Sequence, residues 1–414
     1  MRFTFLLLCI AVLLSARAQD SLMINLPEAE SIFLKENLIL LAEQYHITAK
    51  EALLIQAKAY PNPVFSADVN AYNPPANRFF HADQSGQKAF SVEQLVLLGG
   101  KRSLEIEIAR QNKAIAEAEF SELLRTLKKE LHNSFFNLNQ WQKVIRHADH
   151  QLRILDTIIF SFEEQSMLGN IPVKDVVRLK SVYLKINAGR SALSAAMIDE
   201  MKKMQLLLHS SKMIVPQLSD SVFDKYGPMK TYDDLLQIAF EHRPDFKIAN
   251  GEMAMASLHF QLQKRMLVPD VLVNVSYDQR GGAFNNQVNA GVRIPLPLWD
   301  QNRGNIKSAG VYQKETELYL EQKKLEIASD VGAAHRNMQR SIEEYNKMKS
   351  FYNRDFNEVF NGMNENFQKK NITILEFVDF FEAYMESIRE FERVKAQLGI
   401  SAAQVNYVSA TSIY

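Results

Sequence analysis

The chain has 414 residues, of which 47% are hydrophobic, and its 48 basic and 48 acidic side chains give a formal net charge of zero. The two signs of charge are interspersed, so the sequence lacks the basic surface that nucleic-acid binding requires. Cys9 is the only cysteine, and neither a nucleophile–base motif nor a phosphate-binding loop is present. We therefore expect no enzymatic activity, no cofactor and no bound metal.

Residues 1–18 have the pattern of a secretory signal peptide. Arg2 is followed by an apolar run and then by Ala16-Arg17-Ala18, which is a small-residue cleavage site. After this segment, no apolar run approaches the roughly 18 residues that a transmembrane helix needs. We expect an exported protein whose mature chain starts near Gln19.

The remaining chain divides into two halves with the same order of elements: a helix, two strands, a long helix and a shorter return helix. We assign residues 19–215 to a first structural repeat, 216–229 to a linker and 230–414 to a second structural repeat. In the first half, the periodicity predicts these elements at 28–59, 65–72, 89–95, 102–170 and 173–213. In the second half, it predicts them at 232–267, 271–277, 287–294, 303–371 and 374–408.

The two long helices are the strongest indication of a repeat. Between residues 101 and 168 there is no glycine or proline, and apolar residues recur at the alternating three- and four-residue steps of a coiled coil. Arg102 and Arg303 are 201 positions apart, and so are Asn170 and Asn371. Loops tolerate changes of length more easily than a rigid helix whose ends must reach fixed positions. Two equal helices of about 100 Å indicate a protein that bridges a fixed distance.

The four strands can belong to a membrane or to a soluble protein. Apolar and polar residues alternate in segments such as 65–71 and 271–277, so each strand has one apolar face. Strands of about nine or ten residues can span a bilayer, but four strands leave two open edges, which are very costly in lipid. A closed membrane barrel takes at least about eight strands, so we expect several copies to form one barrel. Eight strands from two copies and twelve strands from three copies are both possible. The alternative is a soluble sheet packed on helices; the signal peptide and the long helices favour the membrane.

Two strand–helix junctions carry a family resemblance. They are Gln94-Leu95-Val96-Leu97-Leu98-Gly99-Gly100-Lys101-Arg102 and Ile294-Pro295-Leu296-Pro297-Leu298-Trp299-Asp300-Gln301-Asn302-Arg303-Gly304. Together with the doubled element order and the turns after the long helices, they resemble the TolC-like family of outer-membrane efflux proteins over nearly all of the mature chain. The second junction looks like the heavy-metal (cation) efflux branch of that family.

The resemblance implies a mostly α-helical fold with a transmembrane β-barrel portion. A homotrimer would form a 12-stranded β-barrel in the outer membrane, with four strands from each protomer, and a long α-helical barrel in the periplasm. The implied partners are outer-membrane lipid, a periplasmic adaptor (membrane fusion) protein and an inner-membrane pump. The implied function is the exit duct of a tripartite efflux system that passes small toxic compounds or metal cations out of the periplasm.

Other functions remain open from the sequence. Within the same family, the chain could be the exit duct of a type I protein-secretion system. From a different class, it could be a periplasmic adaptor or a structural coiled-coil protein without a pore. An adaptor would carry one helical hairpin flanked by small β-domains, whereas here the hairpin occurs twice with only strand pairs between, which argues against an adaptor.

The turns that follow the two long helices are the candidate contact sites for the adaptor. They comprise Gly169, Asn170, Ile171 and Pro172 in the first half and Lys370, Asn371, Ile372 and Thr373 in the second. A purely structural explanation stands beside this one, because Gly169 and Asn170 accept a left-handed backbone and Pro172 suits the first position of a helix.

The resemblance also implies a periplasmic gate made of acidic residues just past these turns, namely Asp175, Glu376 and Asp379. In three copies, Glu376 and Asp379 would form two acidic rings, which favour cations. The structural alternative is that Glu376 forms a capping box with Thr373 and that acids in a first turn complement the helix dipole. The family's arginine at the second turn is absent, since Ile372 stands there.

Overall fold

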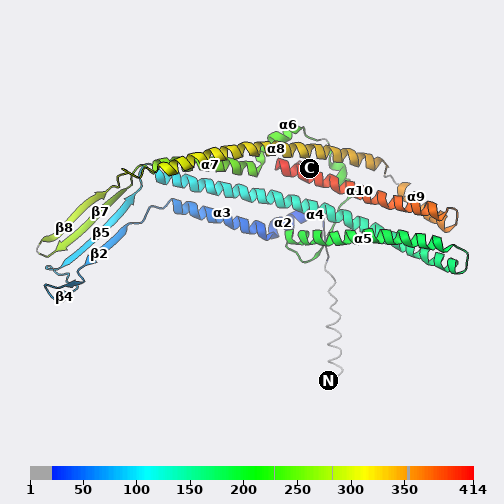
Figure 1. Ribbon diagram of the computed structural model, residues 1–414, viewed down its shortest axis with the longest axis horizontal. Helices are drawn as coiled ribbons and strands as arrows, with labels where there is room; N and C mark the ends of the chain where they lie inside the picture. The colour runs from blue at the N-terminus through cyan, green and yellow to red at the C-terminus, as the bar shows by residue number, and fades with distance from the viewer. Residues whose placement is uncertain (1–20, 228, 282, 352–354) are drawn as a thin grey trace, which may run out of the picture. The chain divides into compact units, whose positions relative to one another are not determined.

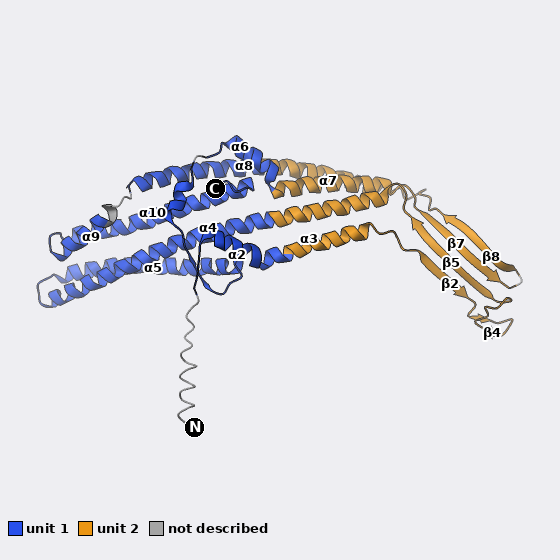
Figure 2. Cartoon of the chain, turned by 180° about the vertical axis from the view of Figure 1, so that it is seen from behind, with its two compact units in different colours: residues 1–42, 122–243, 326–414 blue, residues 43–121, 244–325 orange. Residues whose placement is uncertain are grey.

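The computed structural model describes residues 21–227, 229–281, 283–351 and 355–414 (Figure 1). The signal peptide predicted at residues 1–18 lies outside the described residues. The chain divides into two compact units (Figure 2). Unit 1 comprises Met1–Ala42, Glu122–Arg243 and Glu326–Tyr414, and unit 2 comprises Glu43–Ser121 and Pro244–Leu325.

Unit 2 contains an antiparallel sheet of four strands. The strands are β2 (Val64–Val69), β5 (Gln87–Val96), β7 (Val271–Arg280) and β8 (Phe284–Arg293), in the order β2-β5-β7-β8. The short strands β3 (Tyr72–Asn73) and β4 (Arg78–Phe79) pair with each other in the connection from β2 to β5. Within the described part of the chain, β2 and β8 have no neighbour on their outer sides, so both edges of the sheet are open.

The register of this sheet gathers apolar residues on one face, as the alternation predicts. One row across the sheet is Phe65, Val92, Val275 and Ala290, and the next apolar row is Ala67, Phe90, Tyr277 and Val288. The ring of Phe90 lies 6.3 Å from that of Phe65 and 6.2 Å from that of Tyr277, so an aromatic ladder crosses three strands. The row between them is polar and faces the other side, with Ser66, Ser91, Ser276 and Asn289. Phe65 is 66% exposed and Val288 is 74% exposed, so in the single chain this apolar face lies open.

Four long helices continue from the sheet. They are α3 (Leu38–Ala57), α4 (Lys101–Met167), α7 (Pro244–Arg265) and α8 (Arg303–Phe351). At the start of α4, Gly99 and Gly100 both have positive φ, which confirms the predicted strand-to-helix turn. Asp270, just before β7, accepts a hydrogen bond from the Leu98 amide at 2.9 Å and forms an ion pair with Lys101 at 2.9 Å. The junction sequence therefore ties the start of α4 to the start of β7.

Unit 1 is built from helix ends, shorter helices and a small parallel strand pair. Its elements are β1 (Ser21–Ile24), α2 (Leu26–Glu36), α5 (Val173–Leu207), β6 (Met213–Pro216), the 3₁₀ helix η1 (Asp220–Lys225), α6 (Tyr232–His242), α9 (Asp355–Gln368) and α10 (Ile374–Ser409). Strand β1 pairs with β6 in parallel, with Ser21 opposite Met213. The sequence did not indicate this pair, because both strands have only four residues and lie far apart in the chain.

The first predicted helix, 28–59, is wrong as a single helix, because it breaks at Asn37. The Asn37 side chain accepts hydrogen bonds from the amides of Ile39 and Leu40, both at 3.1 Å, and so caps α3. It also donates to the carbonyl of Leu207 at 3.0 Å. The predicted helix 232–267 is also interrupted, between α6 and α7 at Arg243, and Pro244 begins α7.

The long helix predicted at 102–170 is confirmed, since α4 is continuous over 67 residues. The second long helix is described as α8 up to Phe351 and α9 from Asp355, and whether it is continuous depends on residues outside the described part. The first return helix ends at Leu207 rather than near Met213, and Met213 is instead the first residue of β6. Over the described ranges, no helix has both the length and the hydropathy to cross a membrane.

Candidate functional site

The first tip turn, residues 168–172, joins α4 to α5. The Asn170 amide donates to the carbonyl of Gln165 at 2.9 Å, and the Gly169 amide donates to that of Ser166 at 3.0 Å. This pair of bonds is a Schellman motif, and its left-handed position is Gly169, with φ of +78°. The side-chain amide of Asn170 also donates to that of Gln165 at 2.8 Å. Gly169 and Asn170 are therefore fixed by local chemistry and are also exposed.

The second tip turn, residues 369–373, joins α9 to α10 by the same pattern. The Asn371 amide donates to the carbonyl of Asn366 at 2.8 Å, and the Lys370 amide donates to that of Phe367 at 3.0 Å. The side-chain amide of Asn371 donates to that of Asn366 at 3.1 Å. The left-handed position is Lys370, with φ of +62°, which costs more for a residue with a Cβ than for glycine.

The predicted gate acids occupy different environments. Glu376 closes a capping box: its carboxylate accepts from the Thr373 amide at 2.8 Å, and its own amide donates to the Thr373 hydroxyl at 3.3 Å. The hydrogen bond from the Thr373 backbone lowers the pKa of Glu376, with a further contribution from the Thr373 hydroxyl. Asp175 lies in the first turn of α5 and donates its amide to the Pro172 carbonyl at 3.0 Å. The capping explanation is thus observed for Glu376.

Asp379 is exposed and lines a cavity of about 560 Å³ between α4, α5 and α10. Across this cavity, Lys185 of α5 pairs with Glu382 of α10 at 2.7 Å. Glu386 and Arg389 of α10 line it as well. The cavity therefore brings Asp379 together with carboxylates and cations of two helices, whereas Asp175 and Glu376 do not line it.

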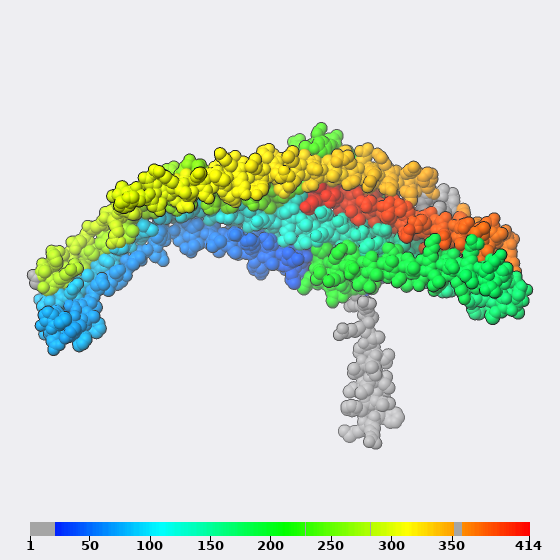
Figure 3. All heavy atoms as spheres, in the orientation of Figure 1, coloured from blue at the N-terminus to red at the C-terminus, as the bar shows by residue number. Residues whose placement is uncertain are grey.

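A buried apolar cluster, here called the tip cluster, joins the two hairpins near their turns. Phe162 of α4 stacks on Phe367 of α9 at 5.4 Å, and Phe367 stacks on Phe377 of α10 at 4.1 Å. In the space-filling view, α5 (green) lies against α9 and α10 (orange to red) at the end that carries the turns (Figure 3). The cluster comprises Leu155, Ile158, Leu179, Val182, Phe360, Phe367, Phe377, Val378, Phe381, Tyr384 and Ile388.

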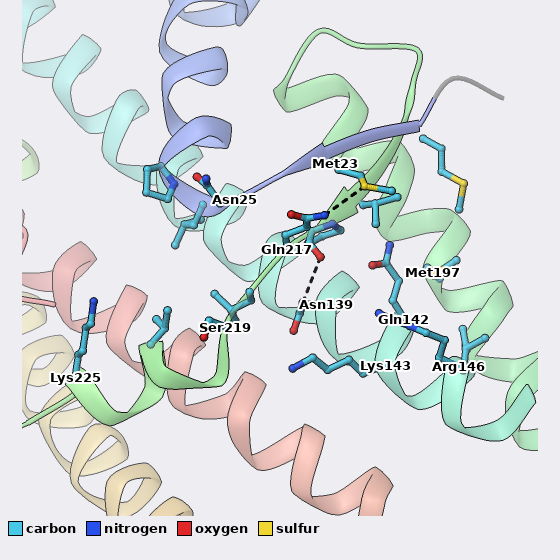
Figure 4. A pocket seen from close by; sticks show the side chains of 18 of the residues that line it. Met23, Asn25, Asn139, Gln142, Lys143, Arg146, Met197, Gln217, Ser219 and Lys225 are labelled. Carbon is cyan, nitrogen blue, oxygen red and sulfur yellow. Dashed lines mark hydrogen bonds between the residues drawn. The ribbon is translucent and has the colours of Figure 1, made fainter. Parts of the chain in front are cut away.

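A cavity of about 1250 Å³ lies beside the β1–β6 pair (Figure 4). Met23 accepts a hydrogen bond at its sulfur from Gln217 at 3.3 Å, and Asn139 donates to the Pro216 carbonyl at 3.4 Å. The lining mixes thioether, amide and basic groups. The sequence does not reveal this cavity, because its walls come from β1, α4, α5, β6, η1 and the C-terminal residues, which are far apart in the chain.

A further feature that sequence reasoning missed is a group of charged side chains that fixes η1. Asp220 pairs with Lys143 of α4 at 2.7 Å and with Lys395 of α10 at 2.8 Å, and Lys395 also pairs with Glu392 at 2.8 Å. Burial opposes the charge of Asp220, but the hydrogen bonds from the two lysines lower its pKa. Lys395 is only 4% exposed, which no sequence signal indicates for a lysine on a helix.

No family model matches the chain. Among curated proteins, it is 22% identical over 287 residues to the cobalt-zinc-cadmium resistance protein CzcC of Cupriavidus metallidurans, a match that covers 69% of this chain and 66% of that protein. It is 20% identical over 318 residues to the nickel-cobalt-cadmium resistance protein NccC of Alcaligenes xylosoxydans xylosoxydans, covering 73% of this chain and 68% of that protein. The match thus spans just under two thirds of the length of CzcC.

Solved structures cover more of the chain. It superimposes on CusC with a TM-score of 0.75 and 15% identity, over 93% of this chain and 92% of that one. On the Campylobacter jejuni CmeC outer membrane channel the TM-score is 0.75 with 12% identity, over 94% and 86%. The fold is that of an outer-membrane channel. The resemblance to TolC-like efflux proteins and the mostly α-helical fold, both predicted from the sequence, are confirmed.

Proposed function

We propose that this protein is the outer-membrane exit duct of a tripartite efflux system, with its helical portion in the periplasm and no enzymatic step. The observation that carries the proposal is the match to channel structures over 93% of the chain with a TM-score of 0.75. The sheet supports it independently, because an exposed apolar face and two open edges are unfavourable in water for an isolated chain.

We infer that three protomers close a 12-stranded barrel with four strands each, β8 of one copy pairing with β2 of the next. Closure would satisfy the backbone groups at both edges, which lipid cannot do. The row with Phe65 and Val92 would face lipid, and the row with Ser66 and Ser91 would face the lumen. The two proposed repeats, 19–215 and 230–414, would then contribute two strands and one tip turn each.

Metal cations are the favoured substrate class. Both curated relatives are named as resistance proteins for metals, cobalt and cadmium among them. A type I protein-secretion duct has no comparable support. The test is deletion of the gene in its native host: tolerance of zinc, cobalt or cadmium should fall and return on complementation. Unchanged metal tolerance together with loss of an exported protein would favour the secretion alternative.

The proposed partners are a periplasmic adaptor and an inner-membrane pump, which would supply the energy. The two tip turns are the proposed adaptor contacts, since their asparagines are held alike and Gly169, Asn170, Lys370 and Asn371 are all exposed. Asp379 is the proposed gate residue, with Asp175 and Glu376 as further acids at the entrance. Opening would move α5 and α10 apart and break the Lys185–Glu382 pair.

Reconstitution into planar bilayers tests the duct directly. We expect discrete channels, and Asp379→Asn should raise conductance or weaken block by cations added at the helical end. The matched control is Glu390→Gln, which removes a carboxylate about three turns further along α10 that already pairs with Arg393. A protein that stays in solution without detergent and forms no channels would contradict the duct.

A further inference from the structure

Three metal-ligating side chains meet in unit 2, where α3 lies beside α4. Glu43 and His46 come from α3 and Glu119 from α4, and one ligand atom of each lies within 4.8 Å of the other two. Glu43 and His46 are three residues apart and so share a helix face, with His46 Nδ1 3.1 Å from Glu43 Oε1. The side chains of His46 and Glu43 are 43% and 27% exposed, so an ion could reach them from solvent.

On the same pair of helices, one lysine balances two other carboxylates. Lys113 of α4 lies 3.1 Å from Glu51 of α3 and 3.7 Å from Glu117 of α4. The hydrogen bond from Lys113 to Glu51 raises the pKa of that lysine. Glu51 and Glu117 therefore have a cation of the chain's own between them.

Glu43 and Glu119 have no such cation. Among the described residues, no lysine or arginine lies within ion-pair distance of either carboxylate, and Glu43 pairs with His46. The imidazole of His46 offers a nitrogen lone pair to a metal ion. Two carboxylates and one imidazole thus meet here, whereas Lys113 lies between Glu51 and Glu117 further along the same two helices.

We propose that Glu43, His46 and Glu119 bind one divalent transition-metal ion of the class of Zn²⁺. One nitrogen and two carboxylate oxygens form a donor set that this ion accepts, and the absence of sulfur disfavours Cu(I). Three protein ligands leave a position for water, so the ion would be exchangeable.

The geometry needs only small adjustment. Ligand atoms around a tetrahedral zinc are about 3.4 Å apart, given bonds of about 2.0–2.1 Å. The three groups lie within 4.8 Å and the side chains of Glu43 and His46 are partly exposed, so rotations about side-chain bonds can close the difference. A bound ion would link α3 to α4, because it draws ligands from both. This site does not depend on the proposed duct function, and it differs from the expectation from sequence that no metal is bound.

The test is a titration of the full-length, tag-free protein in detergent, stripped of metal and followed by calorimetry with Zn²⁺ and by visible absorption with Co²⁺. We expect one ion per chain. His46→Ala and Glu119→Gln should each weaken binding by at least about tenfold, because each removes a ligand. The matched control is Glu117→Gln on the same helix, which should bind as the parent protein does, since Glu117 pairs with Lys113.

Binding by the parent protein that survives unchanged in His46→Ala would place the ion elsewhere and overturn the site. Absence of saturable binding at millimolar Zn²⁺ would overturn it as well. Circular dichroism and thermal unfolding of the metal-free variants check the fold; an intact fold is expected because the His46 side chain is partly exposed. Channel conductance in bilayers is a separate readout, so failure of the metal site leaves the duct proposal standing, and the reverse also holds.

Discussion

The tip cluster of unit 1 and the sheet of unit 2 place their apolar side chains in opposite ways. At the tip, Phe377 and Phe381 are 1% and 0% exposed, because the helices of two hairpins enclose them. In the sheet, Phe65 and Val288 are aligned in rows across strands yet remain 66% and 74% exposed. One region therefore completes its core within the chain, whereas the other leaves its apolar face open in the single chain.

The largest expected effect is in the tip cluster. Phe381→Ala removes a fully buried ring and should lower the free energy of unfolding by about 3–5 kcal/mol, through lost burial and a residual cavity. Thermal unfolding of the purified protein measures this loss. Phe160→Ala, at a position 64% exposed in the chain, is the matched control and should change stability far less. Equal losses in the two variants would contradict a self-contained cluster.

In the sheet, the substitution that should have a large effect is one that places a charge on the exposed apolar face. Val288→Lys places an ammonium group on the apolar face and should cost about 2–4 kcal/mol if that face contacts lipid near the bilayer centre. We expect loss of membrane assembly with the helical circular dichroism retained, measured by membrane fractionation. Asn289→Lys, one residue along on the polar face, should assemble normally. If both variants assemble alike, the apolar face does not meet lipid.

The two tip turns offer a smaller, reciprocal comparison. Gly169→Lys introduces a Cβ at a left-handed position and should destabilise the first turn by about 1–2 kcal/mol. Lys370→Gly removes the same strain from the second turn and should stabilise it by less than about 1 kcal/mol. Hydrogen exchange at the amides of Asn170 and Asn371 reports each turn separately. Changes of the same sign in both turns would argue against backbone strain as the cause.

The smallest effect separates helix capping from gating at Glu376. Because the pKa of Glu376 is lowered in the folded state, its carboxylate stabilises the start of α10 fully above the ordinary pKa of 4.5. This stabilisation is lost as the pH falls through the lower folded value. Protection of the amides at the start of α10 should decline on acidification through this range. Glu376→Gln still accepts in a capping box but does not titrate, so that decline should vanish. A changed conductance in this variant would add a gating role to the capping one.

The sequence predicted those features that local chemistry determines. The α4 helix follows from its apolar spacing and its lack of glycine and proline, and the Thr373–Glu376 capping box follows from residue types three positions apart. The break at Asn37 does not, because an asparagine that caps a helix looks in sequence like one that is solvated. The left-handed Lys370 is likewise invisible, since the hydrogen bonds of the turn outweigh the preference of lysine.

Long-range pairings could not be predicted from the sequence, because they depend on how the helices pack. Glu43 and Glu119 belong to different helices, and only the antiparallel contact of α3 with α4 brings their carboxylates together. Asp220, Lys143 and Lys395 form ion pairs only after η1, α4 and α10 have packed. From the sequence alone, each of these residues has the pattern of an ordinary charged side chain on a solvated surface.

Asn37 has a consequence beyond the break that it makes. Its side chain caps the start of α3 and donates to the carbonyl of Leu207, the last residue of α5, and it is 2% exposed. The positive end of one helix dipole therefore meets the negative end of another through a single amide group. Displacement of α5 along its axis would be transmitted through this joint to α3. The end of α5 opposite the first tip turn is thus joined to the start of α3 by a single asparagine side chain.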